Sequence, residues 1–246
     1  MVSLRRPAKR FAPTWGFTLL ALALAALFVR LGVWQWQRGE HRQAQAARFA
    51  SGADAVLELG SRGVDEVPLY QRVSVAGTLD ATHQFLLDNR IFEGRAGYEV
   101  LTPLIRATPP TLLVDRGWVP FTGSRARLPD VAVTADGPVR LTGRVAGLPS
   151  PGLASGRAAP ASTCPWPKVT SYPDMAQLAT ALGRPLSSRI LLLDPAAPFG
   201  YVRAWQPPGL SPLRHFSYAV QWWSFALLTL VLWVVGSRRP PQAAPS

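Results

Sequence analysis

The sequence predicts a membrane protein in which two transmembrane helices flank an external β-rich domain, one helix near each end of the chain. Two segments, Phe11–Val29 and Phe216–Val235, contain no charged residue. Each is close to the roughly 20 apolar residues that a helix needs to cross a bilayer. Between them, short apolar stretches alternate with turn residues, which is typical of antiparallel strands.

The residues before the first apolar segment include four basic residues and no acidic one. The basic residues are Arg5, Arg6, Lys9 and Arg10. Because basic flanks stay in the cytoplasm, we expect residues 1–12 to be cytoplasmic and residues 13–36 to form the first transmembrane helix. A cleaved signal peptide is the alternative. It is disfavoured because the small residues that could form a cleavage site lie early in a segment that stays apolar after them, at Ala21, Ala23 and Ala25.

Arg30 allows two interpretations. It either marks the outer boundary of the first helix, with its long side chain reaching toward water, or it is a functional charge inside the membrane. Trp34 and Trp36 suit the aromatic belt that forms where a helix leaves the bilayer.

The second apolar segment is followed by Arg238 and Arg239 without an acidic residue. We therefore expect residues 215–235 to cross the membrane, residues 236–246 to form a cytoplasmic tail, and residues 37–214 to form the external domain. The Ala-, Arg- and Pro-rich composition suggests a bacterium. The predicted location is then the inner (cell) membrane, with the central domain in the periplasm.

The central region is predicted to form an antiparallel barrel or sandwich with one helix. In its first strand Val73, Val75 and Leu79 alternate with polar residues, so one face is buried. Pro173, Asp174 and Gly183 suit the ends of a helix over Tyr172–Leu182, and Leu148–Pro167 has a composition typical of disorder. The predicted strands are Tyr70–Leu79, Gln84–Ile91, Gly97–Ile105, Leu112–Pro120, Val139–Leu148 and Arg189–Asp194.

Composition and motifs exclude several function classes. The net charge of +12 is divided between the membrane flanks and residues 37–215, which hold 19 basic and 14 acidic residues, a net of +5. No focused basic face results, so no nucleic acid is expected as a partner. Cys164 is the only cysteine and can form neither an intrachain disulfide nor a zinc finger. No phosphate-binding loop, nucleophile elbow or zinc-protease motif occurs. The sequence nominates no catalytic residue and predicts no enzyme, with a membrane-tethered hydrolase, whose Ser–His–Asp set would assemble only in space, as the alternative.

Two polar motifs interrupt predicted strands, Asp88-Asn89-Arg90 and Asp115-Arg116-Gly117-Trp118. Simple alternation would place Val114, Arg116 and Trp118 on one face and the intervening residues on the other. Glu99, Asp115 and Asp88 are available carboxylate partners for Arg90 and Arg116. We expect a structural ion-pair and hydrogen-bond network, with a polar docking surface as the alternative.

His215 stands at the start of the second apolar segment. His215, Tyr218 and Trp222 have the spacing of one helical face. A histidine beside aromatic residues at a helix end suits an axial haem ligand, whereas the plainer interpretation is a solvated residue at the membrane surface.

Four motifs, in order, make the chain resemble the Surfeit locus protein 1 family of cytochrome c oxidase assembly factors. The first combines Trp34 and Gln35 with the following Arg38. The second contains Tyr98 and Glu99, the third Asp115, Arg116, Gly117 and Trp118, and the fourth opens at His215. In full they read Leu31-Gly32-Val33-Trp34-Gln35, Gly97-Tyr98-Glu99-Val100-Leu101-Thr102-Pro103-Leu104, Leu113-Val114-Asp115-Arg116-Gly117-Trp118-Val119-Pro120 and His215-Phe216-Ser217-Tyr218-Ala219-Val220-Gln221-Trp222.

The resemblance implies an assembly factor for a haem–copper cytochrome c oxidase, acting as a chaperone that handles haem a for the catalytic subunit. His215 would be the haem-iron ligand and the only metal ligand, with Tyr218 and Trp222 as ring contacts and Arg38 and Arg214 as propionate partners. The expected partners are the catalytic subunit, haem a synthase and the lipid bilayer. The alternative is a membrane-anchored external binding or scaffolding module without haem.

Overall fold

The computed structural model describes residues 10–51, 55–135, 137–149, 158–161, 164–207 and 211–239. The chain divides into two compact units, residues 1–46 with 209–246 and residues 47–208. The first is a pair of long helices and the second is a β-barrel domain.

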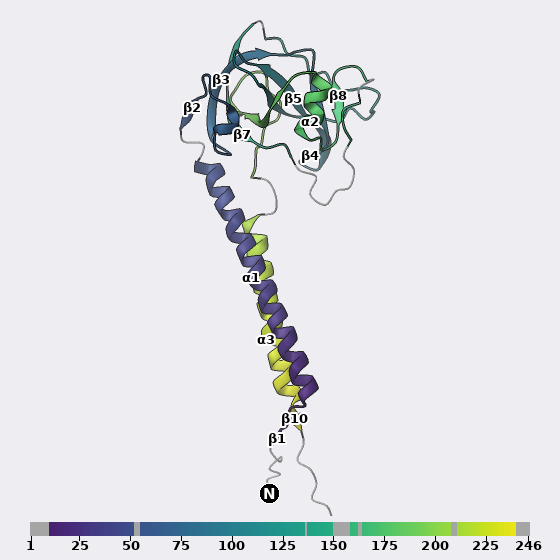
Figure 1. Cartoon of the computed structure of the whole chain (residues 1–246). Helices are drawn as coiled ribbons and strands as arrows, with labels where there is room; N and C mark the ends of the chain where they lie inside the picture. The colour runs from purple at the N-terminus through teal and green to yellow at the C-terminus, as the bar shows by residue number, and fades with distance from the viewer. Residues whose placement is uncertain are drawn as a thin grey trace, which may run out of the picture. The chain divides into compact units, whose positions relative to one another are not determined.

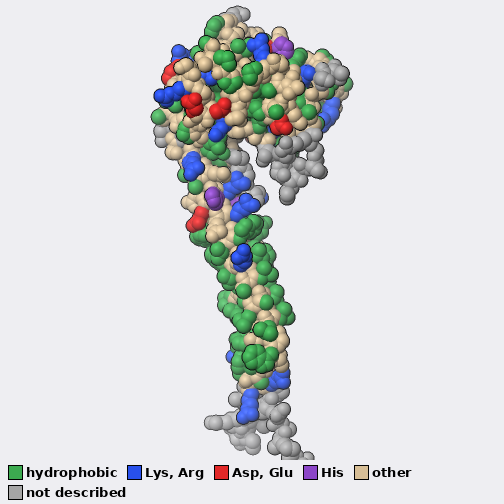
Figure 2. Space-filling view, in the orientation of Figure 1, with side chains coloured by type: hydrophobic (Ala, Val, Ile, Leu, Met, Phe, Trp, Pro, Cys, Tyr) green, Lys and Arg blue, Asp and Glu red, His purple; other side chains and the backbone are tan. Residues whose placement is uncertain are grey.

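The helical unit contains α1 (Trp15–Ser51) and α3 (Pro212–Gly236), together with a short antiparallel pairing of β1 (Arg10–Phe11) and β10 (Arg238–Arg239). The two helices run side by side (Figure 1). Both are long and apolar enough to cross a membrane, which confirms the predicted two-helix layout. Hydrophobic side chains cover much of their outer surface (Figure 2), as expected for a surface that faces lipid. α1 continues well beyond Trp36, and its last residues belong to the barrel unit.

Small residues allow α1 and α3 to approach each other closely. Gly32 lies against the indole of Trp223, and Gly39 lies against the ring of Phe216, so a side chain at either glycine would overlap that ring. Close approach at small residues is the usual basis of helix association in membranes. The other buried residues of the two helices are also small, namely Ala21, Ala25, Ala219 and Ala226.

The second unit is built from one eight-stranded sheet in the order β2-β3-β7-β9-β6-β5-β4-β8. An additional pairing between β3 and β5 closes strands β3, β7, β9, β6 and β5 into a barrel. Most pairings are antiparallel, with β2–β3, β4–β8 and β6–β9 parallel. The strands are β2 (Val56–Glu58), β3 (Arg72–Leu79), β4 (Phe85–Phe92), β5 (Arg95–Ile105), β6 (Thr111–Pro120), β7 (Val139–Ala146), β8 (Lys168–Thr170) and β9 (Leu186–Leu193).

The structure confirms the predicted fold class. All six predicted strands are present with small shifts at their ends, whereas the short strands β2 and β8 were not predicted. α2 (Met175–Leu182) is the predicted helix: Asp174 and Gln177 form a capping box at its start, and Gly183 ends it with a φ of 71°. A single 3-10 turn, η1 (Val64–Glu66), precedes β3. Much of the Leu148–Pro167 segment, for which we predicted disorder, lies outside the described residues.

Candidate functional site

His215 in the helical unit is held by Gln35. Its Nδ1 donates a hydrogen bond to Oε1 of Gln35 at 2.9 Å, linking the first turn of α3 to the middle of α1. A neutral imidazole that donates from Nδ1 keeps the lone pair of Nε2. The contact therefore leaves Nε2 as the atom available to a metal, which is the arrangement in which a second residue orients a metal-binding histidine.

Aromatic rings line the helix pair from the level of His215 to that of Trp222, about two turns further along α3. Trp222 stacks on Phe28 at 5.7 Å between ring centroids, and Trp36 contacts Phe216 at 4.8 Å. Tyr218 is about half exposed and lies on the face of α3 that also carries His215 and Trp222. One side of the histidine is thus fixed by α1, while an aromatic surface continues along α3.

The two predicted propionate partners, Arg38 and Arg214, are both exposed. The guanidinium of Arg38 lies over the ring of Trp34, 5.2 Å from its centroid. Among the described residues, neither arginine forms an ion pair. Their role toward a haem stays a prediction.

Arg30 lies on the face of α1 that is turned away from α3. Phe28 and Gly32, two residues to either side, both contact α3 at Trp222 and Trp223, and a separation of two residues is about 200° around a helix. Arg30 is exposed and forms no ion pair within the described part of the chain. Both interpretations of Arg30, as a boundary residue and as an intramembrane charge, stay predictions.

In the barrel unit, a β-bulge corrects the predicted alternation of the third motif. Asp115 pairs with Leu101 and Trp118 pairs with Glu99, so Arg116 and Gly117 together oppose the single residue Val100. Gly117 has a φ of 109°, a conformation that glycine adopts without a steric penalty. The prediction that Arg116 and Trp118 share a face was wrong: the extra residue turns Trp118 onto the face of Asp115 and Glu99 and leaves Arg116 on the opposite face.

A second bulge lies on the other side of β5. Leu87 pairs with Glu99 and Arg90 pairs with Gly97, so Asp88 and Asn89 oppose one residue, and Asn89 has a φ of 60°. This bulge turns Arg90 onto the Glu99 face. The two irregularities together gather Arg90, Glu99, Asp115 and Trp118 on one face of three neighbouring strands.

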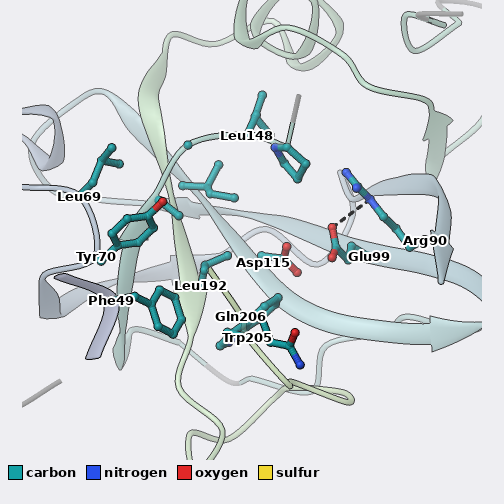
Figure 3. A pocket seen from close by; sticks show the side chains of 14 residues that line it. Phe49, Leu69, Tyr70, Arg90, Glu99, Asp115, Leu148, Leu192, Trp205 and Gln206 are labelled. Atoms are coloured by element: carbon teal, nitrogen blue, oxygen red, sulfur yellow. Dashed lines mark ion pairs between the residues drawn. The ribbon is translucent and has the colours of Figure 1, made fainter. Parts of the chain in front are cut away.

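These residues form a polar cluster at the wall of a cavity. Nε of Arg90 lies 3.0 Å from Oε2 of Glu99, and Asp115 is 1% exposed, with Oδ1 accepting a hydrogen bond from the Gly117 amide at 3.0 Å. Burial raises the pKa of Glu99, an effect that Arg90 opposes. Burial raises the pKa of Asp115 well above its usual range, and the charge of Glu99 contributes a smaller increase. The cavity has a volume of about 380 Å³ (Figure 3).

The contact between Gly97 and Trp118 explains why the second motif contains a glycine and the third motif a tryptophan. The Trp118 ring packs directly over Gly97, where any side chain would overlap it. Its Nε1 donates to the backbone oxygen of Arg90 at 3.2 Å, which ties β6 to β4 across β5. Tyr98, the next residue of β5, is fully buried on the opposite face, in a core cluster with Val100 and Val119.

Among the described residues, buried Arg116 has no carboxylate partner, which corrects the ion pair expected for it, but it does form a network of hydrogen bonds. Its guanidinium donates to Phe199 O at 2.5 Å, Val131 O at 3.0 Å and Gln84 Oε1 at 3.1 Å, and it stacks over the Tyr201 ring at 4.8 Å. Burial lowers its pKa. Of the three predicted carboxylates, Glu99 pairs with Arg90, Asp88 pairs with Arg125, and Asp115 forms no ion pair within the described residues. Arg116 therefore ties distant loops to the sheet.

Sequence reasoning did not identify the aromatic residues of the cavity. Phe49 lies in the last turn of α1, Tyr70 precedes β3 and Trp205 follows β9, so they come from three separate segments. None belongs to a recognisable motif. The only signal was their size, since large aromatic side chains need a place to pack.

Comparison with known proteins gives one consistent result. The model of the SURF1 family matches residues 22–227. SURF1-like proteins of Mycobacterium tuberculosis and Mycobacterium bovis, both described as uncharacterized, are 31% identical over 164 residues, which is 65% of this chain and 56% of theirs. The chain thus matches little more than half the length of these relatives. A SURF1-like protein of Monosiga brevicollis is 28% identical over 89% of this chain and 86% of its own length.

Proposed function

This chain belongs to the SURF1 family, which is linked to cytochrome oxidase assembly, and from that premise we propose that it handles haem a for the catalytic subunit of a haem–copper oxidase. The observation that carries the proposal is the hydrogen bond from His215 to Gln35. It joins the fourth family motif to the first and leaves one imidazole nitrogen available as a ligand. Catalytic chemistry has no part in the proposal.

The residues present fit a haem. Nε2 of His215 would ligate the iron, and Gln35 would hold the ring in the required tautomer and direction. The exposed ring of Tyr218 and the neighbouring Trp222 would contact the macrocycle. Arg38 and Arg214, at the end of the apolar segments, would pair with the propionates through charge-assisted hydrogen bonds. When bound, the haem would supply the iron that the oxidase later uses, while this chain binds, orients and shields it.

The proposed setting is a bacterial inner membrane, with both termini in the cytoplasm and the barrel unit in the periplasm. The basic flanks of both apolar segments support this orientation. The oxidase catalytic subunit and haem a synthase are the proposed partners, because a haem carrier must meet both its source and its destination.

The test is His215→Ala in a strain that makes haem a. The variant should remain in the membrane at normal abundance, lose haem that co-purifies with the wild-type chain, and lower oxidase activity in the membranes. His41→Ala is the matched control, because His41 is an exposed histidine on α1 of the same unit. Equal haem content in the wild type and the His215 variant would contradict the proposal.

A second candidate function is an external binding or scaffolding module without haem. The cavity in the barrel unit favours it, since a buried carboxyl at the wall of a cavity of ligand size is a common feature of binding sites. Haem difference spectra of the purified chain separate the two. A protein without haem that still supports oxidase assembly fits only the second.

A further inference from the structure

The barrel cavity has an unbalanced set of charges. Glu99 and Asp115 lie on neighbouring strands of one face, and Arg90 is the only cation among the described residues that line the cavity. Burying a carboxylate without a countercharge is costly. If both carboxyls ionise, the site is therefore short of one positive charge.

The two carboxyl groups are also incompletely bonded. Oε2 of Glu99 is buried and, although it lies near Nε of Arg90, accepts no well-directed hydrogen bond from the described residues. Nη2 of Arg90 has no hydrogen-bond partner there either, and its guanidinium lies over the Tyr172 ring at 5.2 Å. Asp115 has its backbone hydrogen bond from Gly117 but no cation. Buried polar groups with spare capacity in a native fold point to a ligand.

Apart from the amide of Gln206, the rest of the cavity wall is mostly apolar and partly aromatic, and its aromatic rings are held in place. Phe49 and Tyr70 meet edge to face at 5.4 Å. Nε1 of Trp205 donates to Leu193 O at 2.7 Å, which fixes the indole. Aromatic faces attract ammonium groups. Figure 3 shows the Arg90–Glu99 pair and Asp115 at the cavity wall, and Phe49, Tyr70 and Trp205 lining the same cavity.

We propose that this cavity binds a primary alkylammonium group, with Asp115 and Glu99 receiving the ammonium and the aromatic and aliphatic wall receiving the alkyl chain. The volume of about 380 Å³ lies within the range of small-ligand sites. The group could be carried by a small amine or by a lysine side chain of a partner protein, because both present the same chemistry. The site is separate from His215 and does not depend on the haem proposal.

Binding should release a proton. Burial raises the pKa of Asp115 and so favours its protonated form, and the other titratable groups that face it are Glu99 and Arg90. An arriving ammonium favours the carboxylate form of Asp115. The proton then passes to the buffer, so one charge enters the site and one leaves.

The experiment is calorimetric titration of the full chain in lipid nanodiscs. The probes are n-butylammonium, the neutral isostere 1-butanol, and Nα-acetyl-lysine amide, in two buffers of different ionisation enthalpy at mildly acidic pH. We expect the ammonium probes to bind, the alcohol to bind at least about tenfold more weakly, and the heats to reveal proton release. Tighter binding of the lysine probe than of butylammonium would identify a protein side chain as the source.

Three variants complete the test. Asp115→Asn should weaken butylammonium binding by about tenfold or more and abolish proton release. Glu99→Gln provides a second carboxyl change should the first variant fail to fold. Asp88→Asn is the matched control, because Asp88 is a buried carboxylate of β4 that pairs with Arg125 and does not line the cavity.

Equal binding of butylammonium and butanol, or unchanged binding by the carboxyl variants, would overturn the proposal. His215→Ala should leave ammonium binding unchanged, and Asp115→Asn should leave haem content unchanged. Failure of the ammonium site and failure of the haem proposal can therefore be distinguished.

Discussion

The imidazole of His215 donates its Nδ1 hydrogen bond to Gln35, a residue 180 positions earlier in the chain. The bond is made across the α1–α3 interface, where buried glycines bring the two helices close together. The orientation of the proposed haem ligand thus depends on helix packing as well as on its own sequence neighbours.

Gln35→Leu should reduce haem retention even though it leaves His215 in place. Without the acceptor, the imidazole loses its fixed tautomer, and losses of an orienting partner typically reduce metal affinity by about 10–100-fold. Gln35→Glu keeps an acceptor and should retain most of the haem. The absorbance ratio of haem to protein measures the effect, and Gln37→Leu on an exposed part of α1 is the control. Full haem loading of Gln35→Leu would show that the hydrogen bond has no orienting role.

Gly32→Ala should destabilise the helix pair, because its methyl group would overlap the Trp223 indole. Overpacking of this kind costs about 1–3 kcal/mol. The double variant with Trp223→Leu should recover part of the loss, since the smaller side chain removes the overlap. Thermal unfolding in detergent measures the change. Gly16→Ala is the control because nothing lies near the position of its side chain, and equal melting temperatures for both single variants would refute the packing argument.

Arg116→Ala should lower the free energy of unfolding of the barrel unit by about 3 kcal/mol or more, because several buried carbonyl oxygens lose their donor at once. Arg116→Lys should recover little, since a single ammonium cannot reach acceptors on both sides of the guanidinium. Denaturant unfolding followed by barrel tryptophan fluorescence measures the loss. The exposed Arg95→Ala should change stability by no more than about 0.5 kcal/mol. A stable but inactive Arg116→Ala protein would instead indicate a direct functional role.

Asp115 should make the barrel less stable as pH rises. Its folded pKa is raised by burial, whereas in the unfolded chain it ionises near its usual value of about 3.9. Between these two pKa values the folded state holds more protons, so the free energy of unfolding falls with increasing pH, by at most about 1.4 kcal/mol per pH unit. Asp115→Asn lacks this dependence, and its stability relative to the wild type should therefore increase with pH. Parallel stability curves for the two proteins would exclude a buried protonated Asp115.

Reporter fusions should place residue 100 outside the cytoplasm and Ser246 inside it. The prediction rests on the basic residues, without acidic neighbours, that lie between each apolar segment and the nearer chain terminus. Alkaline phosphatase and fluorescent-protein fusions at both positions give opposite readouts. Fluorescence of a cytoplasmic reporter fused at residue 100 would reverse the proposed topology.

The sequence by itself determined the elements whose cause is local. Runs without charge such as Phe216–Val235 predict membrane helices because a single ionised side chain there is costly. Alternation of Val73 and Val75 with polar neighbours predicts a half-buried strand, because alternate side chains of a strand point to opposite faces of the sheet. The family motifs also lie within single elements, which is why they could be recognised before the fold was known.

Only the tertiary structure decided which face the motif residues occupy. A bulge adds one residue to one strand. Because side chains alternate between the two faces of a sheet, every residue beyond the bulge then lies on the face opposite to the one that simple alternation predicts. Gly117 and Asn89 suit the positive φ of a bulge, but the motifs do not reveal which residues pair across the ladder, because the irregularity exists only relative to β5. The same holds for the bond between Gln35 and His215 and for the cavity rings of Phe49, Tyr70 and Trp205. Each depends on the packing of segments far apart in the chain, which local periodicity does not encode.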